Sequence, residues 1–205
     1  MTESQINHQD LRKQFYHELL QPYQRLVRRV AQNDLVGTGI SDITNDSNAL
    51  AVLASHFIES KKLPSDRDDN LREKLKDVGD SAKHGQLTDA DRTVTLSTSL
   101  AYEIDDTKGA RFLRTEVLAS NNRFGAFDLV ETLGLYISKI NTRFQLGFEN
   151  IEPSIALGSF SGEAEVRITP NTADVKSMNI RTYKRDASGS LILADPGKFT
   201  FVVVK

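Results

Sequence analysis

The spacing of apolar residues changes along this chain, and the change limits the folds that it can adopt. Up to about residue 84, apolar residues recur every three or four positions, as on the buried face of an α-helix. From Val94 they occupy alternate positions, as in a strand with one buried face. Helical spacing returns over residues 126–144 and is then lost again. The pattern predicts an α+β protein whose helical part is interrupted by strands.

Four segments show helical spacing, and together they predict an antiparallel helical bundle. We expect the second helix to follow a break at Gly37 and Gly39, with Asp46 or Ser47 as its N-terminal cap. Gly79 inside the third helix costs about 1 kcal/mol relative to alanine. It therefore indicates close packing against a neighbour or an early end of the helix. The four predicted helices cover residues 8–31, 46–61, 68–84 and 126–144.

The predicted strands fall into two groups. Residues 94–104 and 111–118 predict a β-hairpin, inserted between the third and fourth helices. After a linker at 147–162 that contains Gly, Ser and Pro, further strands predict an antiparallel β-meander. These later strands are expected at residues 163–169, 178–183, 191–193 and 199–204. The predicted domains are residues 1–150, the bundle with its hairpin, and residues 151–205, a β-rich module or an extension of the hairpin's sheet.

Composition excludes several classes of function. The chain has 205 residues and no cysteine, which excludes disulfides, thiolate zinc sites and a cysteine nucleophile. A formal net charge of −2 does not favour nucleic acid or a membrane surface as a partner for the whole molecule. The first residues lack the apolar region of a secretory signal, and no run approaches the roughly 18 apolar residues of a membrane helix. We therefore expect a cytoplasmic protein without membrane contact.

The segment richest in reactive side chains ends the third predicted helix. Asp77, Asp80 and His84 are separated by three and four residues, which places them on one helix face. A histidine flanked by carboxylates is typical of a general base. It is also typical of a metal site, which His56 of the preceding helix would complete.

The same segment has a structural interpretation, which we favour. His84 would end the helix and cap its carbonyl groups, Lys83 would complement the helix dipole, and Gly85 would adopt the left-handed conformation. His56 lies beside the apolar stripe of its own helix, where a partly buried, hydrogen-bonded histidine is expected. The other two histidines lie on the first helix, so no metal site is predicted.

Phosphate-binding motifs are missing. The glycines near residue 38 lack the lysine of a P-loop, and no Gly-x-Ser-x-Gly nucleophile elbow occurs. Basic residues do cluster on the first and third helices, where adjoining faces would bind phosphates. We favour a solvated helical surface instead. The clustered residues are Arg25, Arg28, Arg29, Arg67, Arg72, Lys74, Lys76 and Lys83.

Three short strings stand out in the helical part: Leu50-x-x-Leu53-x-x-His56-Phe57, Leu71-Arg72, and Asp77-x-x-Asp80-x-Ala82-Lys83-His84-Gly85-x-Leu87. They resemble bacterial helical proteins of the HEPN-like type, over about residues 8–146. In that family, a helix with a Leu-x-His pattern precedes a helix ending in Lys-His, and a short hairpin leads into a closing helix. The resemblance implies a helical core and a homodimer.

Active ribonucleases of that family use an arginine followed by four to six residues and then a histidine, usually paired across a dimer. That spacing is absent at His84, because Gly79 lies five residues before it and Arg72 lies too far away. Arg12 and His17 match the spacing, but on the first helix. The resemblance therefore implies the family's fold without its complete catalytic motif.

Two functions from different classes follow. The first, which we favour, is a non-catalytic interaction module of a bacterial or phage regulatory or defence system, binding protein or RNA as a dimer. The second is a metal-independent HEPN-like ribonuclease acting through His84, with Lys83 and Arg92. No cofactor is predicted for either. The candidate binding residues are Asp77, Asp80, His56 and Arg72.

Overall fold

A computed structural model describes residues 7–32, 39–64, 69–105, 109–149, 151, 164–170, 178–185 and 191–194. For residues 39–40, 103–105, 109–111 and the strands after residue 163, it describes the backbone only. Helices and antiparallel strands share the chain, which confirms the mixed α+β class. In chain order the elements are α1 His8–Phe15, the π-helix η1 Tyr16–Leu20, α2 Gln21–Val30, α3 Gly39–Ser60, α4 Asn70–His84, the 3-10 helix η2 Ala90–Arg92, β1 Thr95–Asp105, β2 Gly109–Asn121, β3 Gly125–Asp128, α5 Leu129–Arg143, β4 Ala164–Pro170, β5 Met178–Arg185 and β6 Leu191–Ala194.

The elements α1, η1 and α2 form one continuous helix, which confirms the helix predicted over residues 8–31. Asn7 caps its start, because its side chain accepts a hydrogen bond from the backbone N–H of Gln9 at 3.1 Å. Pro22 follows the wider π-helical turn, where its nitrogen has no proton to donate to that turn. Phe15 and Leu19 of the predicted stripe are fully buried.

The second helix, α3, begins at Gly39, so the start predicted near residue 46 is wrong. Ser47, one of the two predicted caps, is buried inside the helix and donates to the carbonyl oxygen four residues earlier at 2.7 Å. Asp42 and Asp46 lie one turn apart, and both form ion pairs with Arg29 of α2. The first half of α3 is mostly polar, so ion pairs position it where apolar periodicity gives no signal.

The third helix, α4, crosses α3 closely at Gly79. Asp69 caps its start, with Oδ1 accepting from the backbone N–H of Leu71 at 3.2 Å. A Cβ atom at position 79 would lie 3.3 Å from the Cα atom of Val52, closer than ordinary van der Waals contact. This confirms close packing as the reason for a glycine inside the helix.

The described strands form one six-stranded antiparallel sheet in the order β3-β2-β1-β4-β5-β6. Residues 95–105 of β1 pair with 109–121 of β2 as a hairpin, with a bulge between Ala101 and Tyr102. β4 pairs with residues 100–104 of β1. Strands from both predicted domains therefore belong to one sheet.

A short strand precedes the last helix, where the sequence predicts helix from residue 126. Gly125–Asp128 form β3, which pairs with the end of β2. The positive φ of 68° at Gly125 turns the chain back from β2. Asp128 then caps α5, because its Oδ1 accepts from the backbone N–H of Glu131 at 2.9 Å. The helix therefore begins at Leu129, three residues later than predicted.

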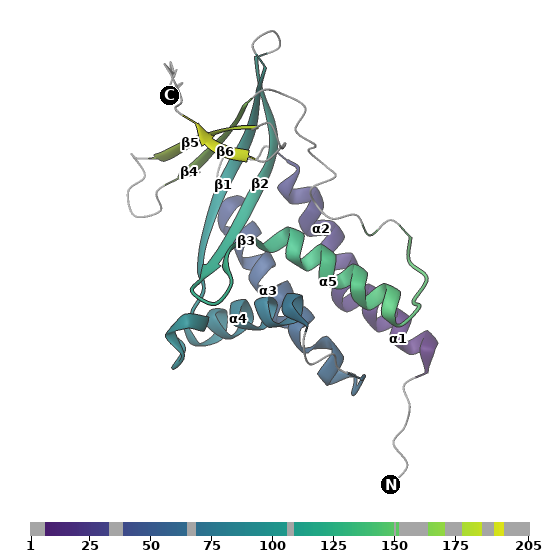
Figure 1. Ribbon diagram of the computed structural model, residues 1–205. Coiled ribbons are helices and arrows are strands. Elements are labelled where there is room, and N and C mark those ends of the chain that lie inside the picture. The colour runs from purple at the N-terminus through teal and green to yellow at the C-terminus, as the bar shows by residue number, and fades with distance from the viewer. Residues whose placement is uncertain are drawn as a thin grey trace.

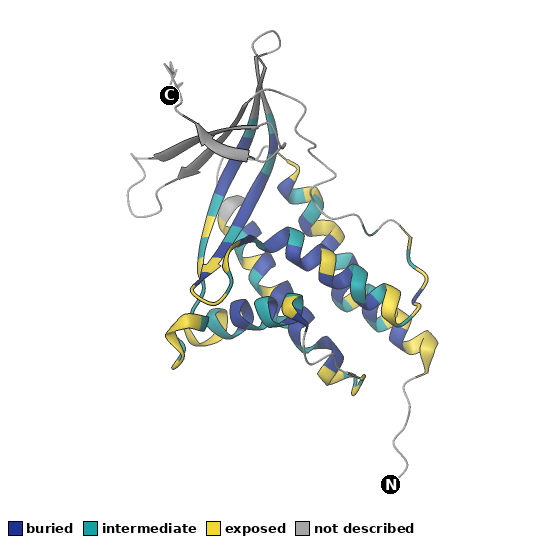
Figure 2. Cartoon of the chain, viewed as in Figure 1, coloured by how far each residue is buried: buried dark blue, intermediate teal, exposed yellow. Residues whose placement is uncertain are grey.

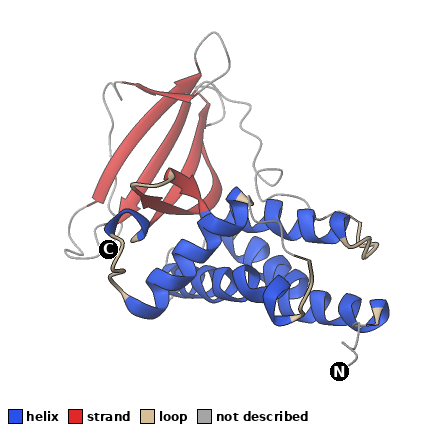
Figure 3. Ribbon diagram, turned by 60° about the horizontal axis from the view of Figure 1, so that its bottom comes forward, coloured by secondary structure: helices blue, strands red, loops and turns tan. Residues whose placement is uncertain are grey.

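The helices gather into one layer, and the long hairpin rises from it (Figures 1 and 3). α5 lies beside the continuous helix α1–α2, and α3 contacts α4, α5 and the hairpin. Buried residues follow the helix sides that face one another (Figure 2). The largest fully buried side chains are Tyr23, Tyr136, Phe15, Phe57, Leu19, Leu26, Leu75, Leu129, Leu133, Ile137, Ile140 and Leu146.

Some predictions concern residues outside those that the structure describes: most of the linker, at 152–162, and the last strand, at 199–204. Within the described part of the chain, no helix combines the length and the apolar character needed to cross a bilayer. The identification of the helices as a HEPN-like bundle stays a prediction.

Candidate functional site

Asp77 of α4 is a fully buried carboxylate beside the hairpin. Its Oδ1 accepts a hydrogen bond from Nε of Arg92 at 2.7 Å, and its Oδ2 accepts from Nδ2 of Asn121 at 3.1 Å. The Nη2 atom of Arg92 donates to Oδ2 of Asp80 at 2.8 Å. One guanidinium group is therefore held by two carboxylates of α4, which confirms that Asp77 and Asp80 share a helix face.

The same cluster fixes the turn between β2 and β3. Oδ1 of Asn121 accepts from the backbone N–H of Phe124 at 2.8 Å. Asn122 donates to Asp91 at 3.0 Å, and Arg123 forms an ion pair with Glu73 of α4 at 3.2 Å. The contacts join α4, η2 and the turn. We call the set the Asp77 network: Glu73, Asp77, Asp80, Asp91, Arg92, Asn121, Asn122 and Arg123.

Arg92 is a permanent cation in this network. Its pKa is raised, first by the hydrogen bond to Asp77 and then by Asp80, against the opposing effect of burial. Arginine keeps its proton at physiological pH even without such partners. Arg92 therefore compensates the buried charge of Asp77 and is unsuited to proton transfer.

A second polar set connects α3 with α4. Nζ of Lys83 lies 3.0 Å from Nε2 of His56, and Nδ1 of His56 lies 3.6 Å from Oε2 of Glu59. Glu59 also forms an ion pair with Arg72. An ammonium group only donates, so the contact is a hydrogen bond from Nζ of Lys83 to Nε2 of His56. We call Lys83, His56, Glu59 and Arg72 the His56 chain.

The His56 chain is open to solvent at His56 and Glu59, whereas Arg72 is buried and its Nε donates to the carbonyl oxygen of Ser55 at 3.4 Å. The side chains of His56 and Glu59 are 42% and 54% exposed. Burial alone would raise the pKa of Glu59, but the charge and hydrogen bond of Arg72, followed by those of His56, lower it overall. Water screens exposed ion pairs, so this chain orients its side chains more than it stabilises the helices.

His84 belongs to neither set. It is the exposed last residue of α4, and it forms no hydrogen bond or ion pair with any residue that the structure describes. Gly85 follows with a positive φ of 71°, and its N–H donates to the carbonyl oxygen of Ser81 at 2.8 Å. The helix ends at His84 as predicted, but the prediction that His84 caps its carbonyl groups is wrong, because the backbone N–H of Gly85 does so instead. Lys83 and Arg92, the two cations predicted beside His84, instead contact His56 and the Asp77 network.

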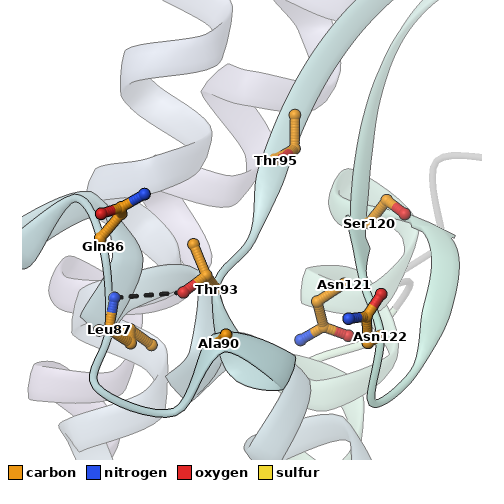
Figure 4. Close-up of a pocket in the computed structure, with 8 residues that line it drawn as sticks. All are labelled: Gln86, Leu87, Ala90, Thr93, Thr95, Ser120, Asn121 and Asn122. Carbon is orange, nitrogen blue, oxygen red and sulfur yellow. Dashed lines mark hydrogen bonds between the residues drawn. The ribbon is translucent and has the colours of Figure 1, made fainter.

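A polar pocket of about 480 Å³ lies beside the end of α4 (Figure 4). It is bounded by the loop that follows α4 and by the ends of β1 and β2, where Thr95 pairs with Ser120. Oγ1 of Thr93 accepts from the backbone N–H of Leu87 at 3.1 Å, which ties together the two ends of the loop between α4 and β1. Three carboxamides, three hydroxyls and two aliphatic groups line it: Gln86, Asn121 and Asn122; Thr93, Thr95 and Ser120; Leu87 and Ala90.

The sequence did not predict this pocket. Its lining comes from residues 86–95 and 120–122, which only the hairpin brings together. Neither segment carries a glycine-rich motif, and the charged residues of the first one, Asp89, Asp91 and Arg92, do not line the pocket. The available signal was the alternation of Thr93, Thr95 and Ser97 with the apolar residues of β1, which leaves a hydroxyl-bearing face away from the core.

In the part of the chain that the structure describes, no group of three or more histidine, cysteine, aspartate or glutamate side chains is arranged to hold a metal ion. The carboxylate oxygens of Asp77 already accept hydrogen bonds from Arg92 and Asn121. No protein-family model matches the chain, and no curated protein or solved structure matches it either.

Proposed function

We propose that this protein is a non-catalytic interaction module that binds a partner protein with the face around the end of α4. The observation that carries the proposal is the double ion pair of Arg92 with Asp77 and Asp80. A catalytic arginine must be available to its substrate, whereas this one serves two carboxylates of its own chain. The proposed setting, a bacterial or phage regulatory or defence system, rests on the resemblance to HEPN-like proteins.

A ribonuclease acting through His84 is the alternative, and the geometry supports it less well. That chemistry needs a histidine that exchanges a proton beside a cation that holds the phosphate. Lys83 contacts His56 instead, and Arg92 is bound to Asp77. Among the described residues, His84 has no hydrogen-bonding partner to orient its ring.

The charges around the site favour a protein partner over RNA. Phosphate binding needs several available lysine or arginine side chains on one face. Exposed Asp89 and Asp91 lie in the loop that follows exposed Lys83. Lys74 lies over the ring of Phe127, 5.1 Å from its centre. A face of mixed charge resembles the polar rim of a protein interface.

Incubation of the purified protein with total RNA in EDTA tests the proposal. We expect no cleavage above that of buffer. His84→Ala removes the candidate residue, and His8→Ala, which replaces an exposed histidine at the start of the first helix, is its matched control. Cleavage that persists in EDTA, disappears in His84→Ala and survives in His8→Ala would favour the ribonuclease over the interaction module.

A homodimer is part of the proposal, because the resemblance implies one. Among the described residues, the exposed large apolar side chains are Leu53 (47%) and Leu135 (42%). Leu53 lines a groove of about 180 Å³ between α2 and α3, together with Pro22 and Ala49. We expect light scattering to give twice the chain mass of 22.9 kDa for the wild type and for Leu53→Met, and the monomer mass for Leu53→Glu. A monomeric wild type would remove the dimer from the proposal.

A further inference from the structure

We infer that the polar pocket beside α4 binds an uncharged segment of the partner protein by hydrogen bonding to the amide groups of that segment. The inference rests on the proposed interaction function and specifies the chemistry that the partner presents. Three properties of the lining carry it: it has no ionisable group, it offers both donors and acceptors, and it has no aromatic ring.

The lining selects against charge. None of its eight residues is ionisable. A charged ligand would lose hydration on entering and would find no opposite charge in the lining, which is unfavourable. The carboxylate of Asp91, outside the lining, already accepts a hydrogen bond from Asn122. Asp77 and Arg92, which both contact Asn121, are already paired with each other. An uncharged ligand therefore suits the pocket best.

The hydrogen-bonding groups around the pocket match an amide. Asn122 donates its amide to a carboxylate of η2, which leaves its Oδ1 as an acceptor. Oγ1 of Thr93 accepts a backbone N–H from the loop, which leaves its hydroxyl proton to donate. Thr95 and Ser120 face each other across the hairpin, and neither hydroxyl has a partner among the described residues. A peptide group needs one acceptor for its N–H and one donor for its C=O.

The apolar part of the lining favours a peptide over a nucleobase or a sugar. Proteins that bind single-stranded nucleic acid stack its bases on aromatic side chains. Here the apolar lining consists of Leu87 and Ala90, neither of which offers a ring to a base or a sugar. A peptide needs no stacking, and these aliphatic groups suit a methyl or methylene of its side chains.

The back wall of the pocket is preorganised by the Asp77 network. Asn121 is 8% exposed, and both ends of its carboxamide are hydrogen-bonded. Side chains that are already fixed lose little conformational entropy when a ligand binds. The Asp77 network therefore fixes a side chain that lines the pocket.

Blocked tetrapeptides test the inference on the full chain. Acetyl-Ser-Asn-Gln-Thr-amide is the uncharged probe, and peptides with Asp-Glu or Lys-Arg at the centre are the charged comparisons. Binding is followed by the NMR shifts of the side-chain amides of Asn121 and Asn122. We expect saturable shifts with up to about 10 mM of the uncharged probe, and at least about tenfold weaker binding of both charged peptides. Raising the salt concentration should change the affinity by less than about twofold.

A pair of variants locates the ligand. Thr95→Val removes one hydroxyl at an exposed strand position with little change in volume. We expect the affinity to fall about fivefold, the value of one neutral hydrogen bond. Ser97→Val, at an exposed position of the same strand outside the lining, should bind as the wild type does. Equal binding by the two variants would overturn the assignment to this pocket.

The outcomes distinguish this inference from the function on which it rests. If no peptide shifts the amide signals and RNA is not cleaved, the pocket inference is overturned and the interaction module stands. Binding of a short single-stranded RNA that weakens steeply with salt would overturn the peptide in favour of a phosphate-bearing partner. RNA cleavage in EDTA that depends on His84 would overturn the proposed function itself.

Discussion

The Asp77 network and the His56 chain each join α4 to another element through a carboxylate paired with an arginine, but the two carboxylates differ in burial. Asp77 is enclosed between α4 and the hairpin, whereas Glu59 of the His56 chain is 54% exposed. Water screens an exposed ion pair and solvates its members when the pair breaks. A buried carboxylate that loses its partner has no such alternative. The difference teaches that burial, more than the presence of charged partners, decides which set stabilises the fold.

The largest expected effect comes from Asp77→Ala. It removes the acceptor of both Arg92 and Asn121 inside the fold, so we expect the free energy of unfolding to fall by about 3 kcal/mol. Urea denaturation measures it. Asp80→Ala is the comparison, because Asp80 binds the same guanidinium but is 23% exposed, and we expect a loss of about 1 kcal/mol. Equal losses would mean that burial does not set the strength of the network.

An intermediate effect is expected for Asn121→Ala. This change leaves Oδ2 of Asp77 and the N–H of Phe124 without their hydrogen bonds, at a cost of about 2 kcal/mol. Hydrogen exchange at the Phe124 amide should become faster. The exposed neighbour variant Asn122→Ala should stay within about 0.5 kcal/mol of the wild type. An Asn121→Ala protein as stable as Asn122→Ala would contradict the structural role of the buried amide.

The smallest effect is expected for Glu59→Gln in the His56 chain, at most about 0.5 kcal/mol at pH 7. The pKa of Glu59 is lowered in the folded protein, so its ion pairs add stability above the ordinary value of 4.5 and lose it as the pH falls through the lowered pKa. The stability difference between the two proteins should therefore shrink in acid. A stability difference that grows as the pH falls would show that folding does not lower the pKa of Glu59.

The sequence predicts the fold well where apolar side chains recur at helical or strand spacing. The stripe through Phe15 and Leu19 locates the first helix to within one residue at its end. The first half of α3 escapes this reasoning, because Asp42 and Asp46 are placed by Arg29 from another helix. The strand β3 could not be predicted in this way either, because its four residues are set by a turn and a helix cap and show no apolar periodicity.

The site is predictable only in part, for a similar reason. The spacing of Asp77 and Asp80 is local, so the sequence places them on one face. Their partner Arg92 comes from a loop that the hairpin folds back, and no local rule assigns it to them. The contact of Lys83 with His56 likewise depends on how α3 and α4 cross. The polar pocket needs the tertiary fold entirely, because its two segments meet only through the β1–β2 pairing.

Two double-mutant cycles test most directly whether the buried pair of Asp77 and Arg92 is a structural element of the fold. One cycle combines Asp77→Ala with Arg92→Met, and the other combines His56→Ala with Lys83→Met, with unfolding free energies measured for every member. We predict a coupling energy of about 2 kcal/mol or more for the buried pair. For the exposed pair we predict at most about 0.5 kcal/mol. Similar coupling energies in the two cycles would contradict the account.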